Sequence, residues 1–126
     1  MSKEVIYTEK APKPIGPYSQ AIKVGRLVFG SGQISIDPRD GKLKGEDVSE
    51  QTRIILTNIS EILKEVGYSL GDIVSVTVFL KKLEDYESFN KVYSEFFKEN
   101  TPARTTVEVS NLPKGALIEI NFIAYR

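Results

Sequence analysis

The chain has 126 residues, of which 40% are hydrophobic and 27% charged, a composition that favours one globular domain over residues 1–126 and argues against disorder. Seventeen basic residues balance seventeen acidic ones, and because nucleic-acid binding rests on phosphate neutralisation, nucleic acid is a poor default partner. Without cysteine or histidine the chain lacks disulfides, thiolate nucleophiles, the Ser-His-Asp triad and the usual zinc ligands, so no metal site is expected.

The N-terminal ten residues are polar and charged, and the sequence contains no apolar run of the 18 or more residues typical of a membrane helix. We therefore expect no membrane partner and a cytoplasmic location. If the protein is an enzyme, proton transfer must fall to a carboxylate, a tyrosine, a lysine or a bound water.

The first third of the chain is predicted to contain three short strands, at residues 4–8, 18–24 and 27–36. The second and third form an antiparallel hairpin, and three prolines make residues 11–17 a loop. Gly30-Ser31-Gly32 lies inside the third strand, where glycine weakens pairing. It indicates either a bulge with tight packing or a place where a ligand approaches the backbone, and both interpretations stay open here.

Two amphipathic helices are predicted. Asp47 is expected to cap the first in a reciprocal arrangement with Glu50, and Gly67 to end it. Its apolar residues recur at helical spacing: Ile55, Leu56, Ile59, Ile62, Leu63 and Val66. The second helix, at about residues 85–98, carries an aromatic stripe of Tyr86, Phe89, Tyr93, Phe96 and Phe97. Asn90 shares that face, so its amide either ties down a neighbouring backbone or faces a wet cleft.

Three further strands are predicted. Residues 73–80 read as a central strand with one apolar side made of Val74, Val76, Val78 and Leu80. Residues 101–125 hold two strands around a turn. Arg104 and Thr106 share one face of the first of these, and Glu119 lies in the second, between Ile118 and Ile120.

This order of elements predicts an α+β domain, a mixed β-sheet with two helices packed on one face. The opposite face of the sheet would stay uncovered although it carries apolar residues such as Ile123. An uncovered, partly apolar sheet face usually indicates an oligomer.

Arg104 and Glu119 are the candidate functional residues. A guanidinium at the start of a strand suits a carboxylate ligand, because its planar fork makes two parallel hydrogen bonds. A carboxyl between two isoleucines would be partly desolvated, which raises its pKa and suits it to proton transfer. The alternative is that the two residues pair with each other, or across an interface, and only stabilise the fold.

The sequence resembles the RidA-type reactive intermediate deaminases, also called the YjgF/UK114 family, from Ala11 to Ala124. The motifs that carry the resemblance are GPYSQAI, SGQI, DIVSVTVFL, DYESFNKVYSEFF and, above all, PAR at residues 102–104 followed by VEVSNLPKGALIEI. The resemblance implies a chorismate-mutase-like fold and a homotrimer with ligand clefts between subunits. It also implies hydrolysis of 2-imino acids, released by pyridoxal-phosphate enzymes acting on serine or threonine, without a cofactor.

The resemblance also implies that Arg104 binds the substrate carboxylate and that Glu119 orients the attacking water. Other cleft positions match Tyr18, Ser31, Gly32 and Asn90. Thr106 stands where many members have cysteine, and its hydroxyl or backbone N–H would line the cleft.

Two other functions are weighed against the deaminase. Ribonuclease or translation-inhibitor activity is also ascribed to members of this family, but the balanced charge and the missing histidine speak against it. In the other alternative the protein is a binding module that holds small carboxylic acids without turnover.

Overall fold

A computed structural model describes residues 2–126. In this part of the chain the elements are β1 (Lys3–Ile6), β2 (Ala21–Val24), β3 (Leu27–Gln33), α1 (Val48–Lys64), β4 (Ile73–Leu80), α2 (Tyr86–Phe96), β5 (Ala103–Glu108) and β6 (Ile118–Tyr125). The expected succession of three strands, a helix, a strand, a helix and two strands is confirmed. The hairpin strands β2 and β3 are shorter than predicted, since residues 18–20 and 34–36 lie outside them.

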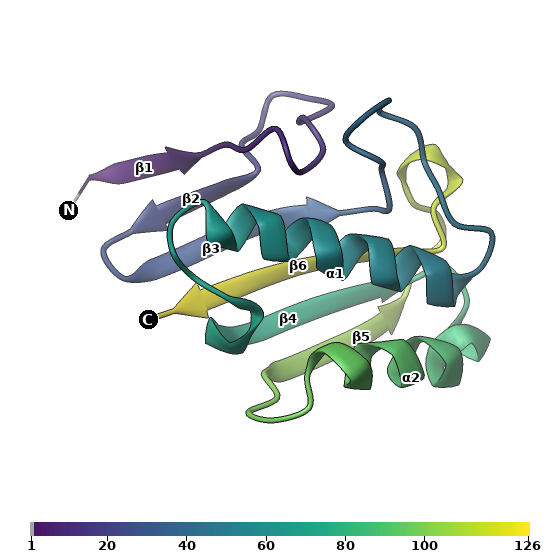
Figure 1. Cartoon of the computed structure of the whole chain (residues 1–126). Coiled ribbons are helices and arrows are strands. Elements are labelled where there is room, and N and C mark those ends of the chain that lie inside the picture. The colour runs from purple at the N-terminus through teal and green to yellow at the C-terminus, as the bar shows by residue number, and fades with distance from the viewer. Residues whose placement is uncertain (1) are drawn as a thin grey trace.

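The six strands form one mixed sheet in the order β1-β2-β3-β6-β4-β5. Every neighbouring pair is antiparallel except β4 and β5, which are parallel because α2 returns the chain between them. Figure 1 shows α1 and α2 side by side in front of the sheet. The α+β class with both helices on one face is therefore confirmed.

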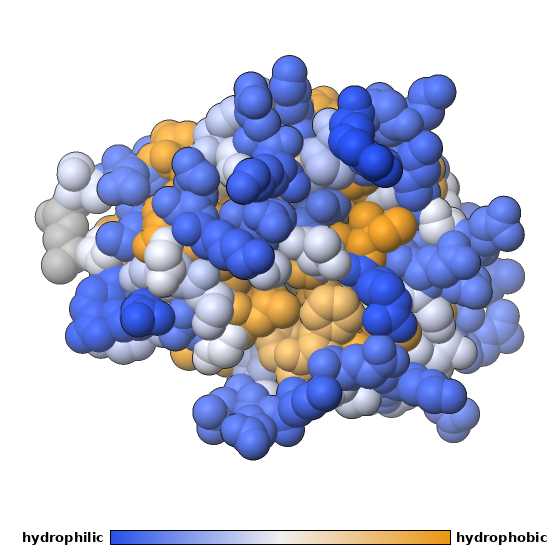
Figure 2. Space-filling model, in the orientation of Figure 1, coloured by the Kyte–Doolittle hydropathy of each residue, from blue (hydrophilic) through white to orange (hydrophobic). Residues whose placement is uncertain are grey.

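The main core lies between this face and the helices. Strands β4 and β6 alternate buried and partly exposed residues, and the side chains of Val78 and Ile120 are fully buried. The predicted apolar stripe of α1 covers them with Ile55, Leu56, Ile59, Ile62 and Leu63, all at 0% exposure. Figure 2 shows that the helix-covered side is mostly hydrophilic, with apolar atoms visible in a band between the helices.

The opposite face of the sheet is covered by neither helix (Figure 1). Its side chains include Val5, Leu27, Phe29, Val107 and Tyr125, each exposed by 37% or more. Exposed apolar residues spread over one sheet face are typical of a surface that another molecule covers. The uncovered face predicted from the sequence is thus present, and the oligomer remains a prediction.

Three local expectations need correction or refinement. Asp47 does cap α1 by accepting a hydrogen bond from the Glu50 N–H at 2.9 Å. The Glu50 carboxylate, however, accepts from the N–H of Glu46, so the expected reciprocal bond to Asp47 is wrong. The last residue of α1 is Lys64, and Gly67 ends the following turn with a left-handed φ of 78°.

The predicted placement of Val74 on one side of the strand with Val76, Val78 and Leu80 is also wrong. The pairing of β4 with β6 shifts register between Ile73 and Ser75, so Ile73 is buried while Val74 is 46% exposed. A bulge inserts one unpaired residue and reverses the alternation beyond it. A second register shift lies in β3 between Gly30 and Gln33, which confirms the bulge predicted for Gly30-Ser31-Gly32.

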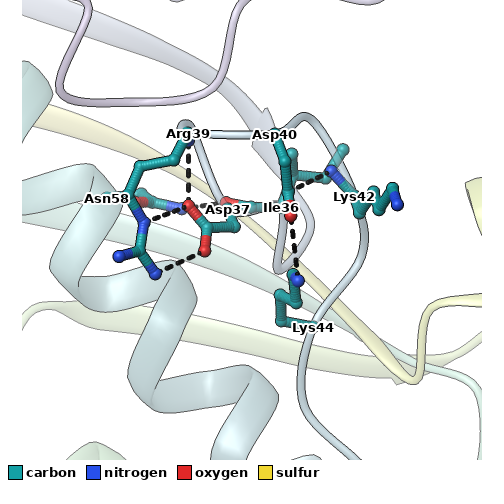
Figure 3. Close-up of polar contacts among 7 residues, drawn as sticks. All are labelled: Ile36, Asp37, Arg39, Asp40, Lys42, Lys44 and Asn58. Atoms are coloured by element: carbon teal, nitrogen blue, oxygen red, sulfur yellow. Dashed lines mark hydrogen bonds and ion pairs between the residues drawn. The ribbon is translucent and has the colours of Figure 1, made fainter.

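The turn that follows β3 is held by two aspartates, as Figure 3 shows. The Arg39 N–H and guanidinium both donate to the Asp37 carboxylate, and Lys42 and Lys44 donate to Asp40. The Asn58 amide on α1 donates to the Ile36 carbonyl at 2.9 Å and anchors the turn to the helix. The hydrogen bonds from Arg39 lower the pKa of Asp37 to about 2.

The substitution Asp37→Asn should lower the melting temperature at pH 7. A carboxyl whose pKa is lower in the folded chain stabilises it fully above its ordinary value of 3.8, and loses that effect as the pH falls toward about 2. Thermal unfolding at pH 7 and pH 2 should therefore show a gap between wild type and variant that closes at the lower pH. Asp85→Asn, where the side chain makes no capping bond to α2, is the matched control.

Candidate functional site

The guanidinium of Arg104 lies over three aromatic rings of α2, which are called the aromatic platform below. The three rings come from Tyr86, Phe89 and Tyr93, which share one side of α2 and lie 5.5, 5.0 and 4.8 Å from the central guanidinium carbon. Arg104 Nη2 also donates a hydrogen bond of 2.9 Å to the Tyr86 hydroxyl. A cation over ring faces is attracted by about 0.5–1 kcal/mol at exposed sites, so the platform holds the guanidinium without neutralising its charge.

The charge of Arg104 has no acidic partner among residues 2–126, where none of the ion pairs within 4.0 Å involves this residue. Arg104 borders a surface depression of about 460 Å³ whose other lining residues include Asn90, Ser94 and Thr101. The sequence left open whether the Asn90 amide ties down a neighbouring backbone or faces a solvent-filled cleft. Its position in the lining of this depression supports the second interpretation. A guanidinium that is open to solvent and unpaired can bind a carboxylate ligand with its donor fork.

Thr106 follows Arg104 on the same side of β5 and pairs with the buried Val78 of β4. It lines a neighbouring depression of about 520 Å³ together with Leu83, Tyr86 and two glutamates. The Thr106 hydroxyl oxygen is buried and finds no hydrogen-bond partner among residues 2–126. Arg104, Asn90 and Thr106, hereafter the arginine group, thus lie at the edge of the sheet beside α2.

Glu119 lies in a different environment. It occupies β6 opposite Phe79 of β4, half-buried, and its carboxylate lies over Gly32. A Cβ atom on Gly32 would be 2.3 Å from Glu119 Oε2, so only glycine leaves room for this carboxylate. Burial raises the pKa of Glu119, because a carboxylate loses favourable contacts with water.

Tyr18 and Ser31 lie next to Gly32. Tyr18 is 45% exposed and lines a small cavity with Gly32, and its hydroxyl accepts a hydrogen bond from the Ile15 N–H at 3.2 Å. The Ser31 hydroxyl donates to the Ser19 carbonyl at 2.6 Å, and its N–H donates to Gln20 at 3.0 Å. Ser31 therefore fixes the loop that carries Tyr18 against β3. Tyr18, Ser31, Gly32 and Glu119 are called the glutamate group below.

The two groups lie on opposite faces of the sheet. Arg104 pairs with Val76, which is 2% exposed beneath the helices, whereas Glu119 pairs with Phe79 on the face that the helices leave open. Paired residues of neighbouring strands point to the same face. Arg104 and Glu119 of one chain are therefore separated by the sheet, and the alternative in which they pair within a chain is wrong.

The role of Tyr86 as the hydrogen-bond partner of Arg104 was not predicted from the sequence. Tyr86 was predicted only as part of the aromatic stripe on the second helix, and its side chain is 38% exposed. The available signal was its position four residues before Asn90, which places the two side chains one above the other on α2.

The comparisons with known proteins identify the family. A family model described as Endoribonuclease L-PSP matches residues 8–126. A RutC family protein of Pyrococcus abyssi is 60% identical over 126 residues, which cover 100% of this chain and 99% of the relative. The chain belongs to the RidA (YjgF/UK114) family.

Two further relatives are named for their chemistry or their family. Human 2-iminobutanoate/2-iminopropanoate deaminase is 44% identical over 122 residues, which cover 97% of this chain and 89% of that protein. The crystal structure of RidA from an Antarctic Psychrobacter superposes with a TM-score of 0.95 at 41% identity, covering 98% of this chain and 99% of that one. The fold and the family inferred from the sequence are thus confirmed for this RidA family member.

Residues 2–126 contain no helix that is both long enough and apolar enough to cross a bilayer. Within the same range, no three histidine, cysteine or acidic residues cluster in a way that could hold a metal ion.

The substitution Glu119→Gln should raise the melting temperature at pH 7. Burial favours the protonated carboxyl, so ionisation of Glu119 destabilises the folded chain. This destabilisation is absent at low pH and develops as the pH rises from the ordinary pKa of 4.5 through the raised pKa. Thermal unfolding should show the variant more stable at pH 7 and indistinguishable from wild type at pH 4. Glu4→Gln, at an exposed position in β1, should leave the melting temperature unchanged at both pH values. A lower melting temperature for Glu119→Gln at pH 7 would contradict the burial penalty.

Proposed function

We propose that this RidA family member hydrolyses reactive 2-imino acids, such as 2-iminopropanoate and 2-iminobutanoate, to the 2-keto acid and ammonia. The observation that carries the proposal is the unpaired Arg104 guanidinium on its aromatic platform, beside a depression large enough for a small acid. The human relative is named for this activity, whereas the Pyrococcus relative bears only the family name.

The chemistry needs an anchored carboxylate and a positioned water. In the proposed reaction Arg104 binds the substrate carboxylate, and Glu119 accepts a proton from a water as its oxygen bonds to the iminium carbon. The C=N π electrons move to nitrogen and give a carbinolamine. Glu119 then returns the proton to nitrogen. As the C–N bond breaks, the electrons of the hydroxyl O–H bond form the carbonyl, the hydroxyl proton passes to Glu119 and from there to the departing ammonia, and the keto acid and ammonium leave. The raised pKa of Glu119 suits a group that must both accept and return a proton.

The two catalytic groups would come from different copies of the chain. Because the sheet separates Arg104 from Glu119, a single chain cannot present both to one small ligand. We propose a homotrimer in which the arginine group of one copy faces the glutamate group of the next. The apolar side chains on the uncovered face, such as Phe29 and Val107, supply the surface that such an assembly would bury.

The proposal predicts that the protein accelerates loss of the imine released by a threonine dehydratase. With semicarbazide competing for 2-iminobutanoate, wild type should reduce semicarbazone formation, and Arg104→Ala should not. Losing the carboxylate contact should cost on the order of 2–5 kcal/mol of binding free energy, which corresponds to a decrease in kcat/KM of roughly 30-fold or more.

Two variants separate binding from chemistry in that assay. Arg104→Ala should lose affinity for 2-oxobutanoate in calorimetric titration, while Glu119→Gln should keep most of that affinity and lose turnover. Arg53→Ala is the matched control, because its guanidinium pairs with Glu95 on the helix surface, outside both groups. Full protection of the imine pool by Arg104→Ala would refute the proposal, and tight keto-acid binding without hydrolysis by wild type would favour the binding module.

The description of the matching family model favours a second candidate, an endoribonuclease. The chain offers no histidine for acid–base catalysis and carries equal numbers of basic and acidic residues. We therefore expect that RNA degradation by a preparation disappears with further purification and does not respond to Arg104→Ala. Activity that co-purifies with the protein and is lost in that variant would establish the ribonuclease instead.

A further inference from the structure

Tyr86 is an exposed tyrosine whose hydroxyl accepts a hydrogen bond from Arg104. It is the first residue of α2, and its oxygen accepts the hydrogen bond from Arg104 Nη2 at 2.9 Å. Within residues 2–126 this is the single hydrogen bond found for the guanidinium. Nothing in the proposed reaction uses it, and the position belongs to neither group defined above.

The aromatic platform alone leaves the direction of the Arg104 donors undetermined. Attraction between a cation and a ring face depends mainly on distance, so Phe89 and Tyr93 allow the guanidinium to rotate above them. A carboxylate, by contrast, is bound best when two N–H groups point the same way in a fixed fork. A hydrogen bond has a preferred direction, and the bond to Tyr86 fixes one corner of the guanidinium.

Asn90 and Arg104 both act on the Tyr86 hydroxyl. The side-chain amide of Asn90 lowers the pKa of Tyr86, and the charge of Arg104 lowers it further. Asn90 lines the depression in front of Arg104, one helical turn beyond Tyr86. The amide, the phenol and the guanidinium thus lie close together at the start of α2, and the phenol accepts the hydrogen bond that orients the guanidinium.

We propose that Tyr86 is a positioning residue that sets the orientation of the Arg104 fork for carboxylate binding. The inference rests on the proposed function in one respect, that Arg104 receives a carboxylate. It goes beyond that function by assigning Tyr86 a contribution to affinity that acts through Arg104 and leaves the chemical step unchanged.

The test is calorimetric titration of the full-length protein with 2-oxobutanoate at pH 7. Tyr86→Phe keeps the ring beneath Arg104 and removes only the hydroxyl, so the affinity should fall by roughly threefold to tenfold, the effect of one lost hydrogen bond. In the imine assay the variant should show a higher KM by a similar factor with kcat unchanged. A residue that only stabilised the fold would not separate KM from kcat in this way.

The alkaline pH dependence gives a second readout. As the pH rises toward the lowered pKa of Tyr86, the phenolate forms an ion pair with Arg104 and competes with the ligand, so wild type should lose affinity. Tyr86→Phe should not show this loss. The other groups near Tyr86 are Tyr93, whose pKa burial raises, and Glu84 and Glu87, which line the neighbouring depression with Tyr86 and are present in both proteins.

Tyr68→Phe is the matched control. It also removes one hydroxyl that makes one hydrogen bond, here to the Arg26 carbonyl at 2.8 Å, and Tyr68 belongs to neither group and lines neither depression beside Arg104. This variant should keep the affinity of wild type. Melting temperatures of all variants show whether a lower affinity reflects unfolding.

The outcomes separate the two proposals. Equal affinities for wild type and Tyr86→Phe would overturn the role of Tyr86 and leave the deaminase intact. Weaker binding by Tyr86→Phe with no imine hydrolysis by wild type would overturn the deaminase and support Tyr86. Failure of wild type to bind 2-oxobutanoate would overturn both.

Discussion

The alternation of side chains along β4 governs the arrangement of the candidate site. Both β5 and β6 pair with β4, and Arg104 and Glu119 lie opposite two residues of that strand, Val76 and Phe79, whose positions differ by an odd number. Because strand side chains alternate with a period of two, the two charges are fixed on opposite faces. No rotamer change can bring them together through a packed sheet. A fixed backbone pattern thus divides the functional residues of one chain into two separate groups.

Patterns along single elements were sufficient to predict most of the fold. The helical spacing of the α1 stripe and the alternation in β6 identified the buried faces correctly, because burial on one side imposes these periods directly. The position of Val74 could not be predicted in this way. Its bulge depends on how β4 fits against Ala124 and Ile123 of β6, and pairing across strands leaves no mark in the local alternation. The partner of the Glu50 carboxylate was missed for a similar reason, since Glu46 lies in an irregular loop.

The site could be predicted residue by residue but not in space. The motif around Arg104 and the polar position of Glu119 singled out both side chains. Their separation was not predictable, because strands that are consecutive in the chain suggest a hairpin, whereas β4 in fact lies between β5 and β6. Tyr86 was missed because an aromatic residue in a helical stripe is usually core. Tyr86 is instead the first residue of α2, where its side chain stays 38% exposed.

The bulge in β3 connects the fold to the glutamate group. Gly30 and Gly32 are two residues apart and would face the same side of a regular strand. Instead, a side chain at Gly30 would collide with Phe122 in the core, and one at Gly32 would collide with Glu119 on the other face. The register shift between Gly30 and Gln33 produces this reversal. The bulge is what turns Gly32 toward the carboxylate and gives Glu119 its half-buried position, and the approach of a ligand to this backbone stays a prediction.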